Sequence, residues 1–167
     1  HKGDFLKAKP YLDHSSQVIG DHADIFGVSD RVRLAAALGT LAFDGCNSER
    51  VMPLLVELEK KIVDVSADER ARFWGTVCQI RRLEGSLDEA VRVGREAVRY
   101  ADNGDTRNSG RDRNHLIHAL IARIRKNRKG GTSDLDEALR LLSESQGEWA
   151  PKDDARALQS HLGFCLH

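Results

Sequence analysis

Two histidines lie three residues apart in the second half of the chain, at His115 and His118. Residues with this spacing share one face of a helix, so the pair offers two imidazoles in one direction, as a zinc site requires. Zinc also needs a third and usually a fourth ligand, and Asp112 is the only carboxylate nearby in the same segment. Both histidines lie opposite the apolar stripe of that segment. We therefore expect them to be solvated, with no metal and no cofactor.

A second polar cluster contains His14, Asp21, His22 and Asp24. Histidines beside carboxylates perform acid–base catalysis when they converge in a pocket. The same residue types are common at helix ends and in loops, where they cap helices and keep the surface soluble. The sequence contains no G-x-S-x-G elbow, P-loop or dinucleotide fingerprint. We predict that the chain is not an enzyme. An enzyme with His14 or His22 as its base is the third hypothesis.

The segment 107–129 carries eight arginines and lysines against Asp112 alone. Its predicted basic face consists of His115, His118, Arg125, Lys126 and Lys129. Such a face can hold phosphates, an acidic peptide or an acidic protein surface. Alternatively, acids of the following helix balance it and the face is merely solvated. These acids are Asp134, Asp136, Glu137 and Glu144.

The composition excludes several function classes. Lys and Arg together number 26 and so do Asp and Glu, so no charge bias indicates a nucleic-acid or membrane partner. Aromatic residues make up 5%, too few for a base-stacking platform. The three cysteines match no disulfide or zinc pattern, and no run is long enough to span a membrane. We expect a cytoplasmic protein with reduced thiols. The excess of arginine over lysine suggests a bacterial source.

The elements that would position these residues are helices. The clearest segment, from Trp74 to Ala101, reads as a helix, a tight turn at Gly85-Ser86 and a second helix. Trp74 is the large residue of the first helix, and Ala90 and Ala97 are small residues where the two helices meet. This pattern resembles one tetratricopeptide-type repeat. The motif S-L-D-E-A at Ser86 recurs near residue 133 with one extra residue, which supports a repeat.

Hydrophobic periodicity predicts eight helices along the chain. Capping boxes are expected at Ser66 and at Ser86, where a serine and a glutamate three residues later each satisfy a free amide. The predicted helices cover about 5–19, 30–43, 49–63, 66–83, 86–101, 112–129, 133–145 and 153–166. The expected loops and turns are 20–27, 45–48 and 102–110, the last of them mobile or an insertion.

Taken with the resemblance, these helices imply an all-α fold, a right-handed superhelix of antiparallel helix hairpins over residues 1–167. We expect one repeat domain, a piece of a longer protein. Its parts would be a half-repeat at 1–27, hairpins at 28–65, 66–104 and 110–147, and a half-repeat at 150–167. Incomplete repeats at the ends leave apolar faces uncovered, so self-association is expected to be possible.

In the resembled family, the first helices of the hairpins line a concave groove. In this sequence that wall would present Arg72, Gly75, Gln79 and Arg82. Chaperone-binding members clamp a peptide carboxylate with a lysine and an asparagine, but Gly75 and Gln79 stand in those places. We therefore do not expect chaperone-tail binding. Arg72, Gln79 and Arg82 remain candidates for gripping a peptide through bidentate and backbone hydrogen bonds.

The resulting prediction is a non-catalytic scaffold, sensor or regulatory module. It would bind a protein or peptide partner, or another domain of its parent chain, in the groove. The alternative is a helical domain that binds anions or nucleic acid through the basic helix 107–129. Binding that falls steeply with added salt would favour this alternative.

Overall fold

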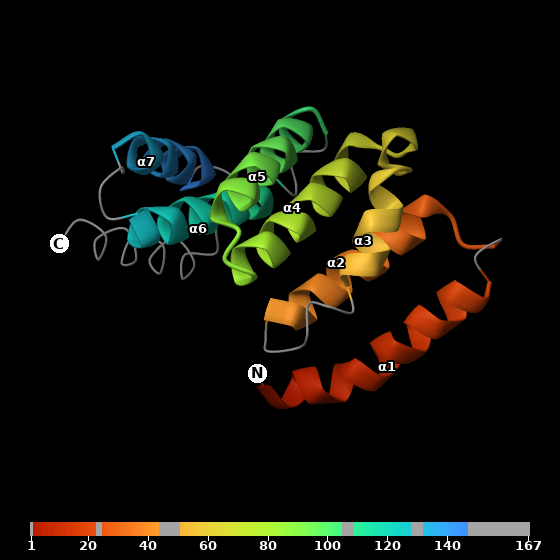
Figure 1. The fold of residues 1–167 in the computed structure, drawn as a ribbon. Coiled ribbons are helices and arrows are strands. Elements are labelled where there is room, and N and C mark those ends of the chain that lie inside the picture. The colour runs from red at the N-terminus through yellow and green to blue at the C-terminus, as the bar shows by residue number, and fades with distance from the viewer. Residues whose placement is uncertain (1, 23–24, 44–50, 105–108, 128–131, 147–167) are drawn as a thin grey trace.

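The computed structural model describes residues 2–22, 25–43, 51–104, 109–127 and 132–146. Every regular element within these ranges is a helix. In Figure 1 the helices follow one another across the molecule from α1 at one side to α7 at the other. The elements are α1 (Lys2–Asp21), α2 (Val28–Phe43), α3 (Met52–Glu59), the 3-10 helix η2 (Ile62–Asp64), α4 (Ala67–Leu83), α5 (Leu87–Asp102), α6 (Ser109–Asn127) and α7 (Thr132–Gln146).

Helices α4 and α5 form the most extensive contact in the described chain, and a short turn joins them. The capping box predicted at Ser66 is confirmed. The Ser66 hydroxyl accepts a hydrogen bond from the Glu69 amide, and the Glu69 carboxylate accepts one from the Ser66 amide, both at 3.3 Å. Gly85 ends α4 with φ at +77°, a left-handed conformation that glycine adopts without strain. The amides of Gly85 and Ser86 then donate to the carbonyls of Arg82 and Arg81, which forms a Schellman motif.

The second capping box, predicted at Ser86, is wrong. Ser86 precedes the first residue of α5, but its side chain makes no capping hydrogen bond. Its ψ of 65° differs from the extended 161° of Ser66, because Ser86 also completes the motif that ends α4. The Glu89 carboxylate instead accepts two hydrogen bonds from Arg92, at 2.7 and 2.8 Å.

Small residues pack where α5 and α7 meet their neighbours, as predicted. The side chains of Ala90, Ala97 and Ala138 are fully buried. Trp74 packs against the core but is only half-buried, and its ring meets the edge of Phe73 with centroids 5.0 Å apart. Phe73, with 1% of its surface exposed, is the large buried residue of α4. Trp74 therefore packs against the core as predicted, while its neighbour Phe73 is the more deeply buried of the two aromatic side chains.

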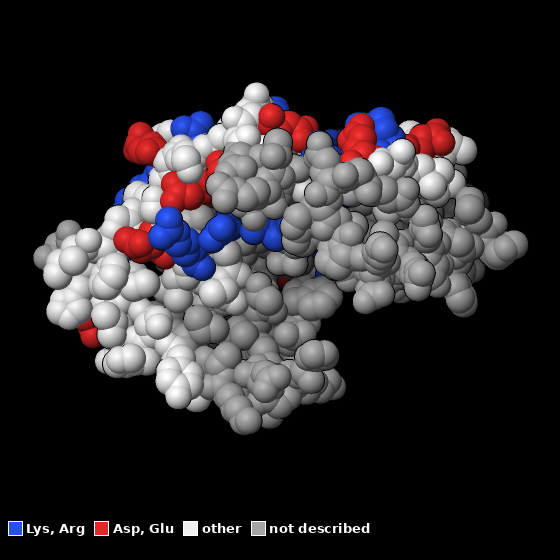
Figure 2. Space-filling model, turned by 180° about the vertical axis from the view of Figure 1, so that it is seen from behind, with Lys and Arg blue, Asp and Glu red and all other residues white. Residues whose placement is uncertain are grey.

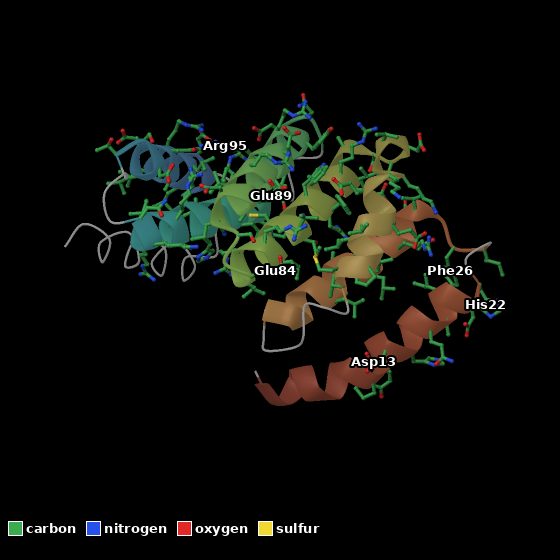
Figure 3. The ribbon with its side chains drawn as sticks, viewed as in Figure 1. Asp13, His22, Phe26, Glu84, Glu89 and Arg95 are labelled. Atoms are coloured by element: carbon green, nitrogen blue, oxygen red, sulfur yellow. The ribbon has the colours of Figure 1, made fainter. Side chains whose placement is uncertain are left out.

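Helix α4 lies at the centre of the packing. It contacts α2 on one side and α6 on the other, and α5 packs against both α4 and α6. Helix α7 packs on α6, and an ion pair between Arg95 and Glu137 joins it to α5 at 2.6 Å. Arg95 is labelled in Figure 3. The helices α2, α4 and α6 therefore form one continuous row.

The predicted helix over 49–63 is shorter than expected. Helix α3 ends at Glu59, and the chain tightens into the 3-10 helix η2. The Arg70 guanidinium of α4 donates to the carbonyls of Val63 and Val65, so polar groups released by the end of the helix find partners. Pro53 lies in the first turn of α3, as predicted.

Other boundaries differ by a few residues. Helix α1 includes Pro10 and extends to Asp21, so Gly20 belongs to a helix and not to the predicted loop. Helices α2 and α6 begin two and three residues before the predicted starts at residues 30 and 112. The predicted turn at 45–48, residues 105–108 of the predicted loop at 102–110 and the eighth helix at 153–166 lie outside the described residues. Of the same predicted loop, Asp102 belongs to α5, and Ser109 and Gly110 belong to α6. No helix in the described ranges combines the length and the apolar character that crossing a membrane requires.

Candidate functional site

The predicted groove residues lie on one face of α4, three and four residues apart. Arg72, Gln79 and Arg82 are half-buried, and Gly75 is buried. This face looks toward α6, because Gly75 and Gln79 both contact α6 side chains. On α6 the facing residues are Arg111, Asp112, His115 and His118. We call these eight residues from α4 and α6 the α4–α6 seam.

Gly75 allows the two helices to approach closely at the seam. A Cβ atom at this position would lie 2.7 Å from Asp112 Oδ1 and 3.1 Å from His115 Nδ1. Both distances are shorter than ordinary van der Waals contact, so any larger residue would push α6 away. Gly75 stands at one of the clamp positions of the resembled family. In this chain it makes room for the carboxylate of Asp112 and the imidazole of His115.

His115 is held inside the seam, which corrects the expectation that it faces water. Its Nε2 lies 2.8 Å from the amide nitrogen of Gln79, and its side chain is 16% exposed. An amide that donates to Nε2 places the remaining ring proton on Nδ1. Nδ1 is buried without a hydrogen bond within the described ranges and lies 3.9 Å from Asp112 Oδ1. Burial lowers the pKa of His115 to about 3, helped by the charges of Arg111, His118 and Arg82.

Asp112 is fully buried, an unusual place for a carboxylate. Arg111 donates to both of its oxygens at 3.0 and 3.1 Å. Burial raises the pKa of Asp112 to about 6, because loss of hydration outweighs the attraction of Arg111 and Arg72, and Asp68 adds repulsion. The seam thus holds a neutral histidine beside a carboxyl group that takes up a proton under mildly acidic conditions.

Arg72 differs from most arginines of the chain. Within the described residues its guanidinium makes no hydrogen bond and no ion pair, although it is half-buried. Its charge acts on Asp112 from a distance, and it borders an open hollow of about 250 Å³ together with Arg33, Ser66, Asp68 and Glu69. At the other end of the seam, burial lowers the pKa of Arg82. A partly dehydrated cation gains free energy when an anion binds it.

The rest of the predicted basic face is less uniform than the sequence indicated. Arg125 and Lys126 are exposed, and Lys126 donates to the Gly85 carbonyl at 3.2 Å. Other cations of α6 pair with neighbouring helices. Arg123 bonds Asp134 and Asp88, and Arg113 bonds Asp102 and Glu144. Lys129 lies outside the described residues. Seen from behind, Lys and Arg atoms form a short row with Asp and Glu atoms close by (Figure 2).

The other candidate residues do not gather into a site. His14 and His22 are exposed, and Figure 3 places His22 at the outer end of α1, away from the row of packed helices. Asp24 lies outside the described residues. No three His, Cys, Asp or Glu side chains cluster as a metal ion would need in the part of the chain that the structure covers.

Sequence reasoning missed the roles of Arg111 and Asp112 in the seam and of Cys78 beside it. The sequence indicated Asp112 only as a single carboxylate near two histidines, Arg111 only as one cation of a charged segment, and Cys78 only as a reduced thiol. Cys78 is buried with its sulfur 3.6 Å from the His115 carbonyl, and burial raises the pKa of this thiol to about 12. The spacing of Asp112 and His115, three residues apart on one helix, was the signal that indicated their proximity.

Comparison with protein-family models, with curated proteins and with solved structures gives no significant match. The fold itself defines the class: the described chain is an all-helical protein of seven α-helices packed in sequential order. Its most chemically distinctive feature is the polar α4–α6 seam.

Proposed function

We propose that this chain is a non-catalytic interaction module that binds a peptide or a partner domain along the α4–α6 seam. In this proposal the hairpins stack as a right-handed, tetratricopeptide-like solenoid, and the row α2, α4 and α6 lines its binding side. The contacts of α4 with both α2 and α6 support that stacking. Stacked helical hairpins offer long surfaces for partners.

The observation that carries the proposal is the state of Arg72. A half-buried guanidinium with no ion pair among the described residues has lost part of its hydration without gaining a partner. Arginines elsewhere in the chain, such as Arg92 and Arg95, pair with carboxylates. A ligand group at Arg72 would supply the missing contact.

The alternative of a nucleic-acid or general anion-binding helix has less support. Arg113 and Arg123 form ion pairs with acids of α5 and α7, and His115 is neutral inside the seam. Phosphate binding depends on several cations placed side by side. The exposed residues Arg125 and Lys126 are the remaining positive part of the predicted face among the described residues.

A selection from a library of displayed random peptides tests the proposal without a known partner. Peptides that the wild-type protein enriches should bind Arg72→Ala and Arg82→Ala at least about tenfold more weakly, because each loses a charge-assisted hydrogen bond. The matched control is Arg92→Ala, which removes an exposed arginine from α5. Enriched peptides that bind both seam variants with wild-type affinity would refute the proposal.

A further inference from the structure

We infer that the Arg72 end of the α4–α6 seam binds one carboxylate group of a partner, and that Asp112 is an internal competitor whose charge regulates this binding. The inference rests on the proposed function and adds the chemistry of the ligand and its control. It follows from the arrangement of two arginines around one buried carboxylate.

Two arginines, Arg111 and Arg72, lie near the buried carboxylate of Asp112, and only Arg111 forms hydrogen bonds with it. Arg111 directs two hydrogen bonds to Asp112 but remains 30% exposed, so part of its guanidinium still faces outward. Arg72 approaches Asp112 from the opposite helix without a hydrogen bond to it. Guanidinium groups bind carboxylates through paired N–H donors, and both arginines keep donors for a second carboxylate.

The local charges favour an anionic ligand. Arg72, Arg82 and Arg111 contribute three positive charges to the seam, while Asp112 contributes one negative charge and Asp68 another at the edge. Glu69 does not alter this balance, because it caps Ser66 and lies 3.9 Å from Arg33. The seam is therefore positive when Asp112 is ionised. Its net charge rises by one unit when Asp112 is protonated, because the carboxyl group becomes neutral.

A protein carboxylate fits this site better than a nucleic acid. A nucleic acid strand carries a phosphate at every nucleotide and would bring further negative charges against Asp112 and Asp68. A single carboxylate can reach Arg72 from the open hollow of about 250 Å³ that this arginine borders together with Arg33 and Ser66. The ligand group is either an acidic side chain or a C-terminal carboxylate, since both offer the same pair of oxygens.

The protonation state of Asp112 sets the net charge of the proposed carboxylate site. The charged groups that face it are Arg111 on its own helix and Arg72 and Asp68 on α4, with His115 one turn away. On α5 and α7, Asp102 and Glu144 bond Arg113 instead. Burial holds the pKa of Asp112 at about 6, so mild acid neutralises this carboxylate while a ligand glutamate stays ionised. Carboxylate binding should therefore strengthen as the pH falls from 7.5 to 5.

The test titrates the protein with short blocked peptides and follows binding by nuclear magnetic resonance. The probes are Ac-Gly-Glu-Gly-NH2 for a side chain, Ac-Gly-Gly-Gly-OH for a C-terminus, and Ac-Gly-Gln-Gly-NH2 as the uncharged control. One of the two charged probes should bind more tightly than the control, and Arg72→Ala should weaken that binding about tenfold. If both charged probes bind no better than the uncharged control, the inference is overturned.

The internal competitor is tested with Asp112→Asn. This variant should bind the preferred acidic probe about tenfold more tightly than wild type at pH 7.5, because a negative charge beside the site is removed. The wild-type affinity should rise by a similar factor between pH 7.5 and 5, and the variant should show no such rise. An unchanged or lower affinity of Asp112→Asn, or a rise that persists in it, would overturn the inference.

A second variant keeps the test decisive if Asp112→Asn does not fold. His118 is a second histidine of the seam, so His118→Gln should retain the pH-dependent rise if Asp112 is responsible. Loss of the rise in His118→Gln would assign the effect to the histidine and contradict the inference. If selected peptides require Arg72 and Arg82 but contain no acidic group, the inference fails while the proposed function stands.

Discussion

The titrations of His115 and Asp112 should change the free energy of unfolding in opposite directions as the pH falls. Single substitutions of these two residues should separate the two effects. Burial gives His115 a pKa of about 3 in place of 6.5, and gives Asp112 a pKa of about 6 in place of 3.8. We therefore consider His115→Gln, which leaves the carboxyl group alone, and Asp112→Asn, which leaves the imidazole alone. Both replacements nearly conserve side-chain volume.

The signs of the two effects are opposite. The folded state holds His115 neutral, so its contribution to the free energy of unfolding is complete above pH 6.5 and falls as the pH drops toward 3. The folded state binds a proton on Asp112 more tightly than the unfolded chain does. The free energy of unfolding therefore rises as the pH drops from about 6 toward 3.8.

The magnitudes follow from about 1.4 kcal/mol for each pH unit between the folded and unfolded pKa values. Between pH 7 and pH 4, His115 should remove about 3 kcal/mol of stability, and Asp112 should return about 3 kcal/mol. In wild type the two nearly cancel, so the pair changes the free energy of unfolding by less than about 1 kcal/mol over this range. His115→Gln should become about 3 kcal/mol more stable relative to wild type on acidification, and Asp112→Asn about 3 kcal/mol less stable.

Urea unfolding followed by tryptophan fluorescence between pH 7 and pH 4 measures these changes. Subtracting the wild-type curve removes the contribution of other carboxylates, such as Glu57 and Glu69, whose pKa values are lowered by hydrogen bonds. Curves of both variants that run parallel to wild type would refute the reasoning, because they would mean that neither group is buried as described.

Three further predictions concern stability and reactivity. Gly75→Ala should lower the free energy of unfolding by about 1–3 kcal/mol, because its Cβ would lie 2.7 Å from Asp112 Oδ1. The control is Gly20→Ala, which has open space around the new Cβ and should be neutral or slightly stabilising in the same urea titration. Ser66→Ala should lower the free energy of unfolding by about 1 kcal/mol, because the helix loses its N-cap hydrogen bond. Ser86→Ala should leave the midpoint of urea unfolding almost unchanged, and equal effects of the two substitutions would contradict the difference in capping. In a variant with Cys46→Ser and Cys165→Ser, Cys78 should react with a thiol reagent only as fast as the protein unfolds, because its side chain is fully buried and burial raises its pKa to about 12. Fast labelling of Cys78 in native buffer would be incompatible with this packing.

Much of the helical framework was predictable from local sequence. The turn at Gly85, the capping box at Ser66 and the burial of Ala90 and Ala97 all follow from patterns within a few residues of each other. The end of the helix predicted at 49–63 was harder, because the Arg70 guanidinium that donates to the carbonyls of Val63 and Val65 comes from the next helix, α4. The packing of the hairpins into a superhelix stays a prediction.

The seam could be predicted only in part. A helical wheel for α6 correctly places His115 opposite the apolar stripe, but it cannot show that α4 covers this second face. The cover exists because Gly75 lacks a side chain and Gln79 reaches the imidazole. Such contacts join residues about 36 positions apart, so they depend on tertiary packing and not on local pattern.

The central claim is that a partner binds along the α4–α6 seam. The most direct measurement titrates the strongest peptide from the library selection into protein with labelled arginine and histidine side chains and records their nuclear magnetic resonance shifts. The signals of Arg72 and His115 should move together with one dissociation constant, while those of Arg92 and Arg140 on α5 and α7 stay in place. Shifts confined to Arg92 and Arg140 would contradict the claim.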